Sequence, residues 1–240
     1  MKKIISLLLI ISLGIANANA QTPEVQDLVA KGVKLHDSGD FNGAIELYKQ
    51  ALAIDEKSPL VNYELSSSYF SLKNYEKAIE YADHVIDYGK DYVKDAYILK
   101  GSAEDLAGRS EDAVQTYKKA IKKFPDSYLL HYNLALTSYN NRDNKTAEES
   151  LQKALLIRPT HGSSHLLLGY VMQAQGSRVK SLLALYNFLL LEPNGPRTES
   201  AYKFLLEQLK QGVSKGKDKK TPSILPSIPG KTRMNSVQRN

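Results

Sequence analysis

The chain has 240 residues, a formal net charge of +6 and no cysteine. Without cysteine it can form no disulfide bond, thiolate metal site, cysteine nucleophile or lipidated N-terminal cysteine. The positive charge belongs to the ends, because residues 213–240 hold seven Lys or Arg against one Asp, whereas residues 21–212 hold 23 basic and 25 acidic side chains. This distribution excludes a basic body of the kind that binds nucleic acid, so we expect no nucleic-acid partner.

Residues 1–20 have the pattern of a secretory signal peptide. Lys2 and Lys3 precede an apolar run over residues 4–16, and the small residues Ala18 and Ala20 follow it. The run is 13 residues long, shorter than the roughly 20 that span a bilayer. We therefore expect cleavage after Ala20 and an exported, periplasmic protein with no transmembrane segment after cleavage. Secretion, or inner-membrane anchoring by an uncleaved signal, is the alternative.

The same pattern of residues then occurs five times in succession. Its clearest position is Ala44, which maps to Ala78, Ala113, Ala147 and Ser181 at steps of 34, 35, 34 and 34 residues. A fixed period of this length is the signature of stacked repeats. Each unit holds two apolar-periodic stretches of about a dozen residues with a turn between them, which predicts helix-turn-helix units.

The eighth position of each unit is occupied by a small residue. These residues are Gly32, Ser66, Gly101, Ala135 and Gly169. Small side chains at one place in every unit allow two helices to approach closely, so we expect the helix crossing there.

The chain resembles the tetratricopeptide repeat family. The units are residues 25–58, 59–93, 94–127, 128–161 and 162–195. The matching features are the small eighth residue, the alanine at the twentieth position, Tyr48 and Tyr117 at the twenty-fourth, and Pro125, Pro159 and Pro193 at unit ends. The resemblance implies an all-α, right-handed solenoid over residues 21–212. The second unit is one residue longer, so we expect irregular packing between the second and third units.

Two segments follow the fifth unit. The apolar spacing in residues 196–212 predicts a capping helix whose apolar face holds Tyr202, Leu205, Leu206 and Leu209. A solenoid needs such a cap because its last repeat would otherwise leave an apolar side in water. Residues 213–240 contain charges and prolines without periodicity, which is the composition of a disordered basic tail.

No pattern of catalytic residues is found. His161 and His165 have the spacing of two metal ligands on a helix, but the residues between them lack the glutamate of a zinc motif, so we predict packing roles and no metal or cofactor. Residues 229–232 match the last residues of a phosphate-binding loop motif, but the first glycine of that motif is missing, so we predict no phosphate site there. Acidic pairs such as Glu104 and Asp105 are predicted to be solvated.

The resemblance implies that the first helix of each unit lines a concave groove. The groove residues expected from it are Val29, Val33, His36, Tyr63, Ser67, Phe70, Asp95, Ile98, Tyr132, Leu136, Tyr139, Asn140, Leu166 and Tyr170. They include four tyrosines and no lysine or arginine, which favours an apolar or aromatic-anchored segment over a clamp for a terminal carboxylate.

We therefore expect a non-enzymatic scaffold that binds a protein or peptide partner in this groove. The first alternative is an adaptor that binds an anionic surface or polyanion through the basic tail, with peripheral membrane contact. The second is an enzyme that depends on a groove carboxylate such as Asp95 or Asp105.

Overall fold

The computed structural model describes residues 22–211, 213–215 and 222–224, so the predicted signal peptide lies outside the described residues. The described residues form helices α1 (Pro23–Asp37), α2 (Phe41–Ile54), α3 (Pro59–Ser71), α4 (Tyr75–Tyr88), α5 (Val93–Leu106), α6 (Ser110–Lys123), α7 (Tyr128–Asn140), α8 (Asn144–Ile157), α9 (Gly162–Ala174), α10 (Arg178–Leu191) and α11 (Thr198–Lys210), and strands β1 (Val213–Lys215) and β2 (Pro222–Ile224). The predicted all-α solenoid is confirmed: ten of the helices pack as five consecutive pairs, and α11 packs on α10.

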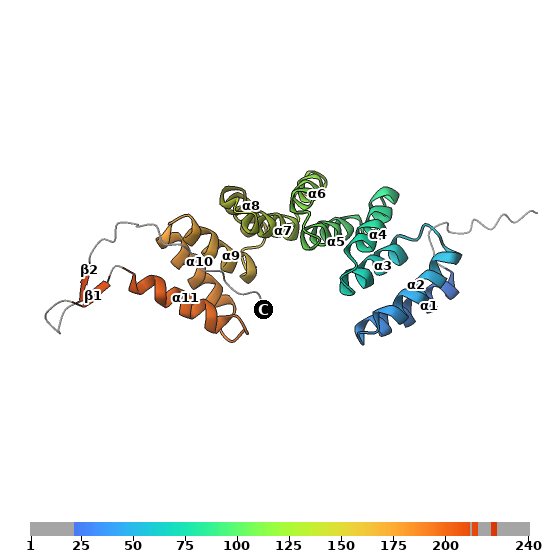
Figure 1. Ribbon diagram of the computed structural model, residues 1–240, viewed down its shortest axis with the longest axis horizontal. Helices are drawn as coiled ribbons and strands as arrows, with labels where there is room; N and C mark the ends of the chain where they lie inside the picture. Colours follow the sequence, from blue (N-terminus) through green and yellow to red (C-terminus); the bar gives the residue numbers. More distant parts are fainter. Residues whose placement is uncertain (1–21, 212, 216–221, 225–240) are drawn as a thin grey trace, which may run out of the picture.

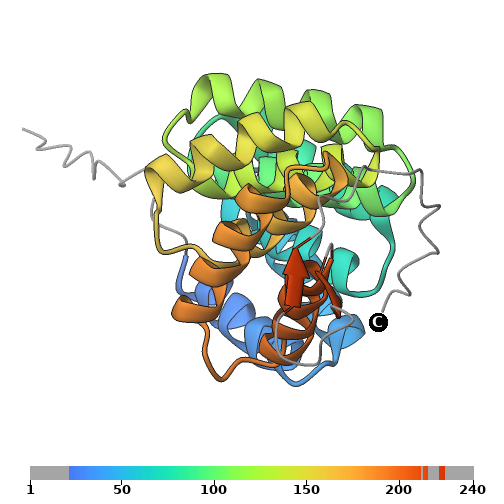
Figure 2. The same cartoon turned by 90° about the vertical axis from the view of Figure 1, so that its left-hand side faces the viewer.

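The pairs stack into an arc (Figure 1). The first helices also contact one another, α1 with α3, α3 with α5, α5 with α7 and α7 with α9. Figure 1 shows α3, α5 and α7 on the concave side of the arc and α4, α6 and α8 on its convex side. Seen end-on in Figure 2, α1 and α2 (blue) and α11 (orange-red) lie on the same side of the molecule, opposite the convex helices.

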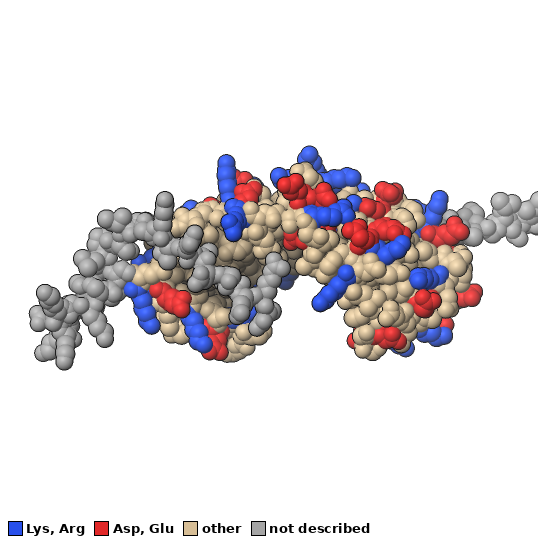
Figure 3. Space-filling model, in the orientation of Figure 1, with Lys and Arg blue, Asp and Glu red and all other residues tan. Residues whose placement is uncertain are grey.

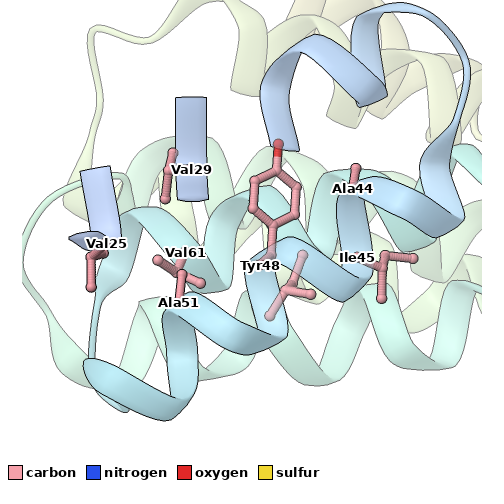
Figure 4. Close-up of a cluster of buried hydrophobic side chains, with 8 residues drawn as sticks. Val25, Val29, Ala44, Ile45, Tyr48, Ala51 and Val61 are labelled. Carbon is pink, nitrogen blue, oxygen red and sulfur yellow. The ribbon is translucent and has the colours of Figure 1, made fainter. Parts of the chain in front are cut away.

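The core is a series of small clusters along the solenoid, because each pair contacts only its neighbours. The first cluster joins α1, α2 and α3 around Tyr48, which is fully buried (Figure 4). Tyr117 occupies the matching place in the third unit and is 1% exposed. Its hydroxyl lies 3.0 Å from the Ser102 hydroxyl.

The small eighth residues lie where the helices of a pair cross. A Cβ atom added to Gly101 would lie 2.6 Å from the Tyr117 ring, and one added to Gly169 would lie 2.8 Å from Leu185. Gly32 meets the ring of Tyr48 in the same way. The eighth residue of each unit therefore has no room for a larger side chain when the twenty-fourth residue is large.

The turns within the pairs share one backbone feature. Each contains a residue in the left-handed region, where an L side chain is strained and glycine is not. These residues are Gly39, Lys73, Gly108, Arg142 and Gly176. They recur at the repeat period, so the same turn is built with glycine in three units and with a long cationic residue in two.

The connection between α4 and α5, where irregular packing was expected, has a backbone conformation different from that of the other connections between units. Helix α4 is followed by its cap residue Gly89, which has a φ of 65°, and α5 begins after Tyr92, which has a φ of 62°. In the other connections the residue directly after the second helix has a negative φ, as at Asp55 with a φ of −128° and Phe124 with a φ of −131°. The extra residue of the second unit is therefore accommodated in a different turn.

Helix α11 packs against α10 through a face that matches the predicted one only in part. Ala201 and Gln208 are buried and Phe204 and Leu205 pack in the same cluster, whereas Tyr202 is 51% exposed. Leu209 is also exposed. The predicted face was right for Leu205 and wrong for Tyr202 and Leu209, because counting large apolar residues overlooks the small Ala201, which is fully buried.

Beyond α11, strands β1 and β2 form a short antiparallel pair in which Val213 is opposite Ile224 and Lys215 is opposite Pro222. The composition of residues 213–240 predicts disorder, so this pairing was not expected. The remaining residues of the tail lie outside the described ones.

Candidate functional site: the inner surface of the arc

All fourteen groove residues expected from the sequence lie on the first helices of the pairs. Three are on α1, three on α3, two on α5, four on α7 and two on α9. These first helices contact one another in succession, so the fourteen residues lie on neighbouring helices, of which α3, α5 and α7 are on the concave side of the arc in Figure 1.

Four of the aliphatic residues serve mainly in packing. Val29 is 8% exposed and Leu166 is 7% exposed, and both belong to core clusters. Val33 is partly buried against the core cluster of α1, α2 and α3, and Leu136 is partly buried against the core cluster of α7, α8 and α9. The surface available to a partner therefore depends more on the aromatic and polar residues.

The N-terminal half of the inner surface contains a stacked pair of tyrosines. The rings of Tyr63 and Tyr92 lie 5.5 Å apart with 20° between their planes. Burial raises the pKa of Tyr63, and the negative charge of Asp95 raises it further. Tyr92 was not among the expected groove residues, since it lies in the irregular α4–α5 connection and its place follows no repeat position.

Two further aromatic residues of this half are held by their neighbours. His36 places Nδ1 2.9 Å from the Ser68 hydroxyl and packs edge-on against Phe41. Phe70 packs edge-on against Tyr75 of the next helix. These contacts fix the ring orientations before any partner binds.

Three tyrosines line the C-terminal half. Tyr132 packs edge-on against His161 with ring centroids 5.0 Å apart, and Tyr170 contacts Phe204 of α11 at 5.2 Å. Tyr139 packs against the cluster around α8 and α9. Burial raises the pKa of each of these three hydroxyls further above neutral pH, where a tyrosine hydroxyl is already a protonated donor.

Arg197 is a residue of this surface that the sequence analysis missed. Its guanidinium donates to the Ser163 hydroxyl at 3.0 Å and to both carboxylate oxygens of Glu192 at 2.8 Å. Ser163 and Arg197 are one repeat period apart, so extending the unit count into α11 would have found it. The inner surface therefore has a cation at its C-terminal end, partly neutralised by Glu192.

The two histidines with metal-ligand spacing make separate contacts. His161 places Nδ1 2.8 Å from the Ser164 hydroxyl, and His165 places Nε2 2.8 Å from the carbonyl oxygen of Pro159. Burial and the nearby Arg158 lower the pKa of His161. Within the described part of the chain, no cluster of three or more His, Asp or Glu side chains could hold a metal ion.

Glu104 was predicted to be solvated, and the structure shows that this prediction was wrong. It is 2% exposed and its Oε1 lies 3.7 Å from Lys100. The sequence pattern did not reveal this because Glu104 occupies a position of α5 that faces α6.

A hollow of about 780 Å³ lies between α6 and the turn after α7, lined by Arg109, Asp112, Ser138 and Asp143 among others, and it includes none of the fourteen groove residues. Figure 3 shows lysine, arginine and carboxylate side chains intermixed along the convex side over α4, α6 and α8. Among the described helices, none combines the length and the apolar character needed to cross a membrane.

Comparison with known proteins gives the family. The chain is 28% identical over 138 residues to the BBSome complex member BBS4 of Bos taurus, covering 58% of this chain and 26% of that protein. It is 30% identical over 134 residues to the Hsp70-Hsp90 organising protein of Plasmodium falciparum, covering 56% of this chain and 50% of that protein. The chain thus spans between a quarter and a half of the length of these two relatives.

Solved structures share the fold at low sequence identity. The MamA protein matches with a TM-score of 0.60 and 23% identity over 71% of this chain and 92% of that one. YrrB, described as a tetratricopeptide protein with an unusual peptide-binding site, matches with a TM-score of 0.57 and 16% identity over 78% of this chain and 94% of that one. Two sequence profiles described as tetratricopeptide repeat match residues 35–101 and 98–171, which together make up more than half of the chain. The chain therefore belongs to the tetratricopeptide repeat family.

Proposed function

We propose that this protein is a non-enzymatic scaffold that binds a segment of a partner polypeptide along the inner surface of its solenoid. The observation that supports this most is the row of half-buried tyrosines on the first helices. The row consists of Tyr63, Tyr132, Tyr139 and Tyr170. Tetratricopeptide proteins typically bind protein partners, and a half-buried ring on such a surface can contribute contact area and a hydroxyl donor at little cost in side-chain entropy.

The relatives support the same proposal. YrrB is described as having a peptide-binding site, and the Hsp70-Hsp90 organising protein is named for its work with two other proteins. By analogy we extend polypeptide binding to this chain. Because Arg197 is already paired with Glu192, we expect apolar and aromatic side chains of the partner to contribute more than a terminal carboxylate.

We further propose that the scaffold works in the periplasm. The support is the pattern of residues 1–20, in which a short apolar run follows Lys2 and Lys3. Protein isolated from its native cells should then have an intact mass corresponding to a chain that begins at Gln21. Recovery of the full-length chain from washed membranes would show that the signal is an uncleaved anchor.

Site-specific photo-crosslinking in the native cell tests the binding surface. A photoreactive amino acid placed at Tyr139 or Tyr170 should crosslink one defined polypeptide. The control positions are Glu80 and Lys118, which are exposed on α4 and α6 of the convex side, and they should give no such product. A product obtained at the control positions and absent at both tyrosines would contradict the proposal.

A further inference from the structure

The outward face of α10 carries a row of exposed apolar side chains. Val179 is 70% exposed, Leu183 60%, Tyr186 57% and Leu190 62%. Their spacing of four, three and four residues places them on one face of the helix. The opposite face, with Leu185 and Phe188, is buried in the core. Helix α10 is therefore apolar on both the buried and the outward side.

The other four second helices do not share this outward face. The residues in the same register are Asn42, Glu46, Lys49 and Ala53 on α2; Glu76, Glu80, Asp83 and Asp87 on α4; Glu111, Gln115, Lys118 and Lys122 on α6; and Lys145, Glu149, Gln152 and Leu156 on α8. Charged and polar residues dominate these positions, as expected for a solvated face. Four apolar residues in the same places on α10 indicate a contact that the other units do not make.

The charge on α10 also sets it apart. It carries Arg178 and Lys180 and no carboxylate, whereas each of the other second helices carries at least one. Lys180 lies 3.4 Å from Glu148 yet its side chain is 65% exposed. A surface that faces α10 gains from negative charge near the helix's first turn.

The basic end of the chain begins beside this face. Arg178 donates to the carbonyl oxygen of Leu209 at 3.1 Å, which ties the last turn of α11 to the first turn of α10. Residues 213–240, with seven Lys or Arg against one Asp, follow directly in the sequence. The chain therefore leaves α11 next to the first turn of α10, which carries Arg178 and Lys180.

We infer that the outward face of α10 is a docking surface for an anionic phospholipid bilayer. Helix α10 lies along the interface with Val179, Leu183, Tyr186 and Leu190 among the acyl chains next to the headgroups, while Arg178 and Lys180 contact lipid phosphates. A second copy of the chain fits less well, because its α10 would bring no carboxylate to Arg178 and Lys180. The contact is peripheral, and it leaves the concave surface free for a partner.

Binding to vesicles tests this inference. The form used is residues 21–240, because the apolar run in residues 4–16 would itself enter a bilayer and the described helices contact one another within residues 22–211. The protein should float with vesicles of equal phosphatidylglycerol and phosphatidylcholine, and far less with phosphatidylcholine alone. Leu183→Glu with Leu190→Glu should lower the partition coefficient at least about tenfold.

The matched control is Gln115→Glu with Gln152→Glu. It changes the net charge by the same amount at outward positions of α6 and α8, so it should retain nearly all binding. Circular dichroism of both double variants should show unchanged helix content, because all four positions are exposed. Equal loss in both variants would mean that charge alone governs binding, and it would overturn the role of the apolar row.

A fluorescence measurement gives a second readout that does not depend on the glutamate variants. The chain has no tryptophan, so Tyr186→Trp introduces a single reporter on the row. Its emission should shift to shorter wavelength on addition of the anionic vesicles, while Lys118→Trp in the same register of α6 should not respond. An unchanged Tyr186→Trp emission with vesicles, or a shift that grows with protein concentration without vesicles, would overturn the inference, the latter in favour of a second copy of the chain.

Discussion

At the scale of single residues, the crossing of each helix pair depends on the combined size of two side chains. Gly32 lies against Tyr48, and Gly101 lies against Tyr117. In the fourth unit the corresponding pair is Ala135 and Leu151, in which the eighth residue is larger and its neighbour smaller. The small eighth residues are evident from the sequence, but that each lies against the twenty-fourth residue of its unit follows only from the helix crossing in the structure.

This size matching predicts a coupled pair of substitutions. Gly32→Ala should destabilise the protein by about 2 kcal/mol, because the added methyl group meets the Tyr48 ring. Combining it with Tyr48→Leu recreates the pair found in the fourth unit. Chemical denaturation should therefore show a coupling of about 1 kcal/mol or more in the double variant. Additive effects would mean that the two side chains do not compete for the same space.

Glu104 predicts a dependence of stability on pH. Burial raises the pKa of its carboxyl group, and its Oε2 atom has no hydrogen-bond partner among the described residues. A carboxyl group whose pKa is raised on folding contributes stability below its unfolded pKa, and that contribution is lost as pH rises through the folded pKa. Glu104→Gln should therefore raise the melting temperature at pH 7 more than at pH 4.

The control for this prediction is Glu149→Gln, because Glu149 is exposed on α8. It should shift the melting temperature little at either pH. Lys100 keeps Asp83 as a partner at 2.5 Å in the Glu104 variant, so no lone buried cation is created. A lower melting temperature for Glu104→Gln at pH 7 would show that the ionised form is stabilised by its neighbours.

At the scale of the elements, the turns within the pairs show how a repeat tolerates unfavourable residues. Arg142 has a φ of 64° and Lys73 a φ of 60°, in a place where three other units have glycine. Arg142→Gly should stabilise the protein by about 1 kcal/mol, since an L side chain in this conformation costs roughly that amount. The reverse substitution, Gly108→Ala, should destabilise it through the backbone alone, because no atom lies within 4 Å of the added Cβ. Denaturation midpoints that move in the same direction for both variants would contradict this account.

The helices themselves were predictable because the same apolar pattern occurs in five units, so each unit supports the assignment of the others. The buried face of α11 was not, since a single helix gives no comparison and Tyr202 and Leu209 counted as core residues although both are exposed. The Tyr63–Tyr92 stack was equally hidden, because Tyr92 lies in a connection that departs from the repeat. Sequence reasoning was therefore most informative where units can be compared and least informative where the chain leaves the repeat.

At the scale of the whole molecule, the arc separates two surfaces of different chemistry. Its first helices carry the tyrosine row, and α4, α6 and α8 carry intermixed positive and negative charge on the convex side (Figure 3). The placement of the fourteen groove residues on the first helices followed from the family pattern. The presence of Arg197 among them did not, because it comes from the segment after the fifth unit.

The most direct test of the central claim is the affinity of the crosslinked partner for single tyrosine variants of the inner surface. The variants are Tyr63→Ala, Tyr132→Ala, Tyr139→Ala and Tyr170→Ala, and the control is Tyr186→Ala on the outward face of α10. Titration calorimetry should show a loss of about 2 kcal/mol of binding free energy for each inner-surface variant whose tyrosine is a well-packed anchor. The Tyr186→Ala control should retain full affinity. If all four inner-surface variants bind as tightly as the unaltered protein while reversal of the lysine charges in residues 213–240 abolishes binding, the inner surface is not the site.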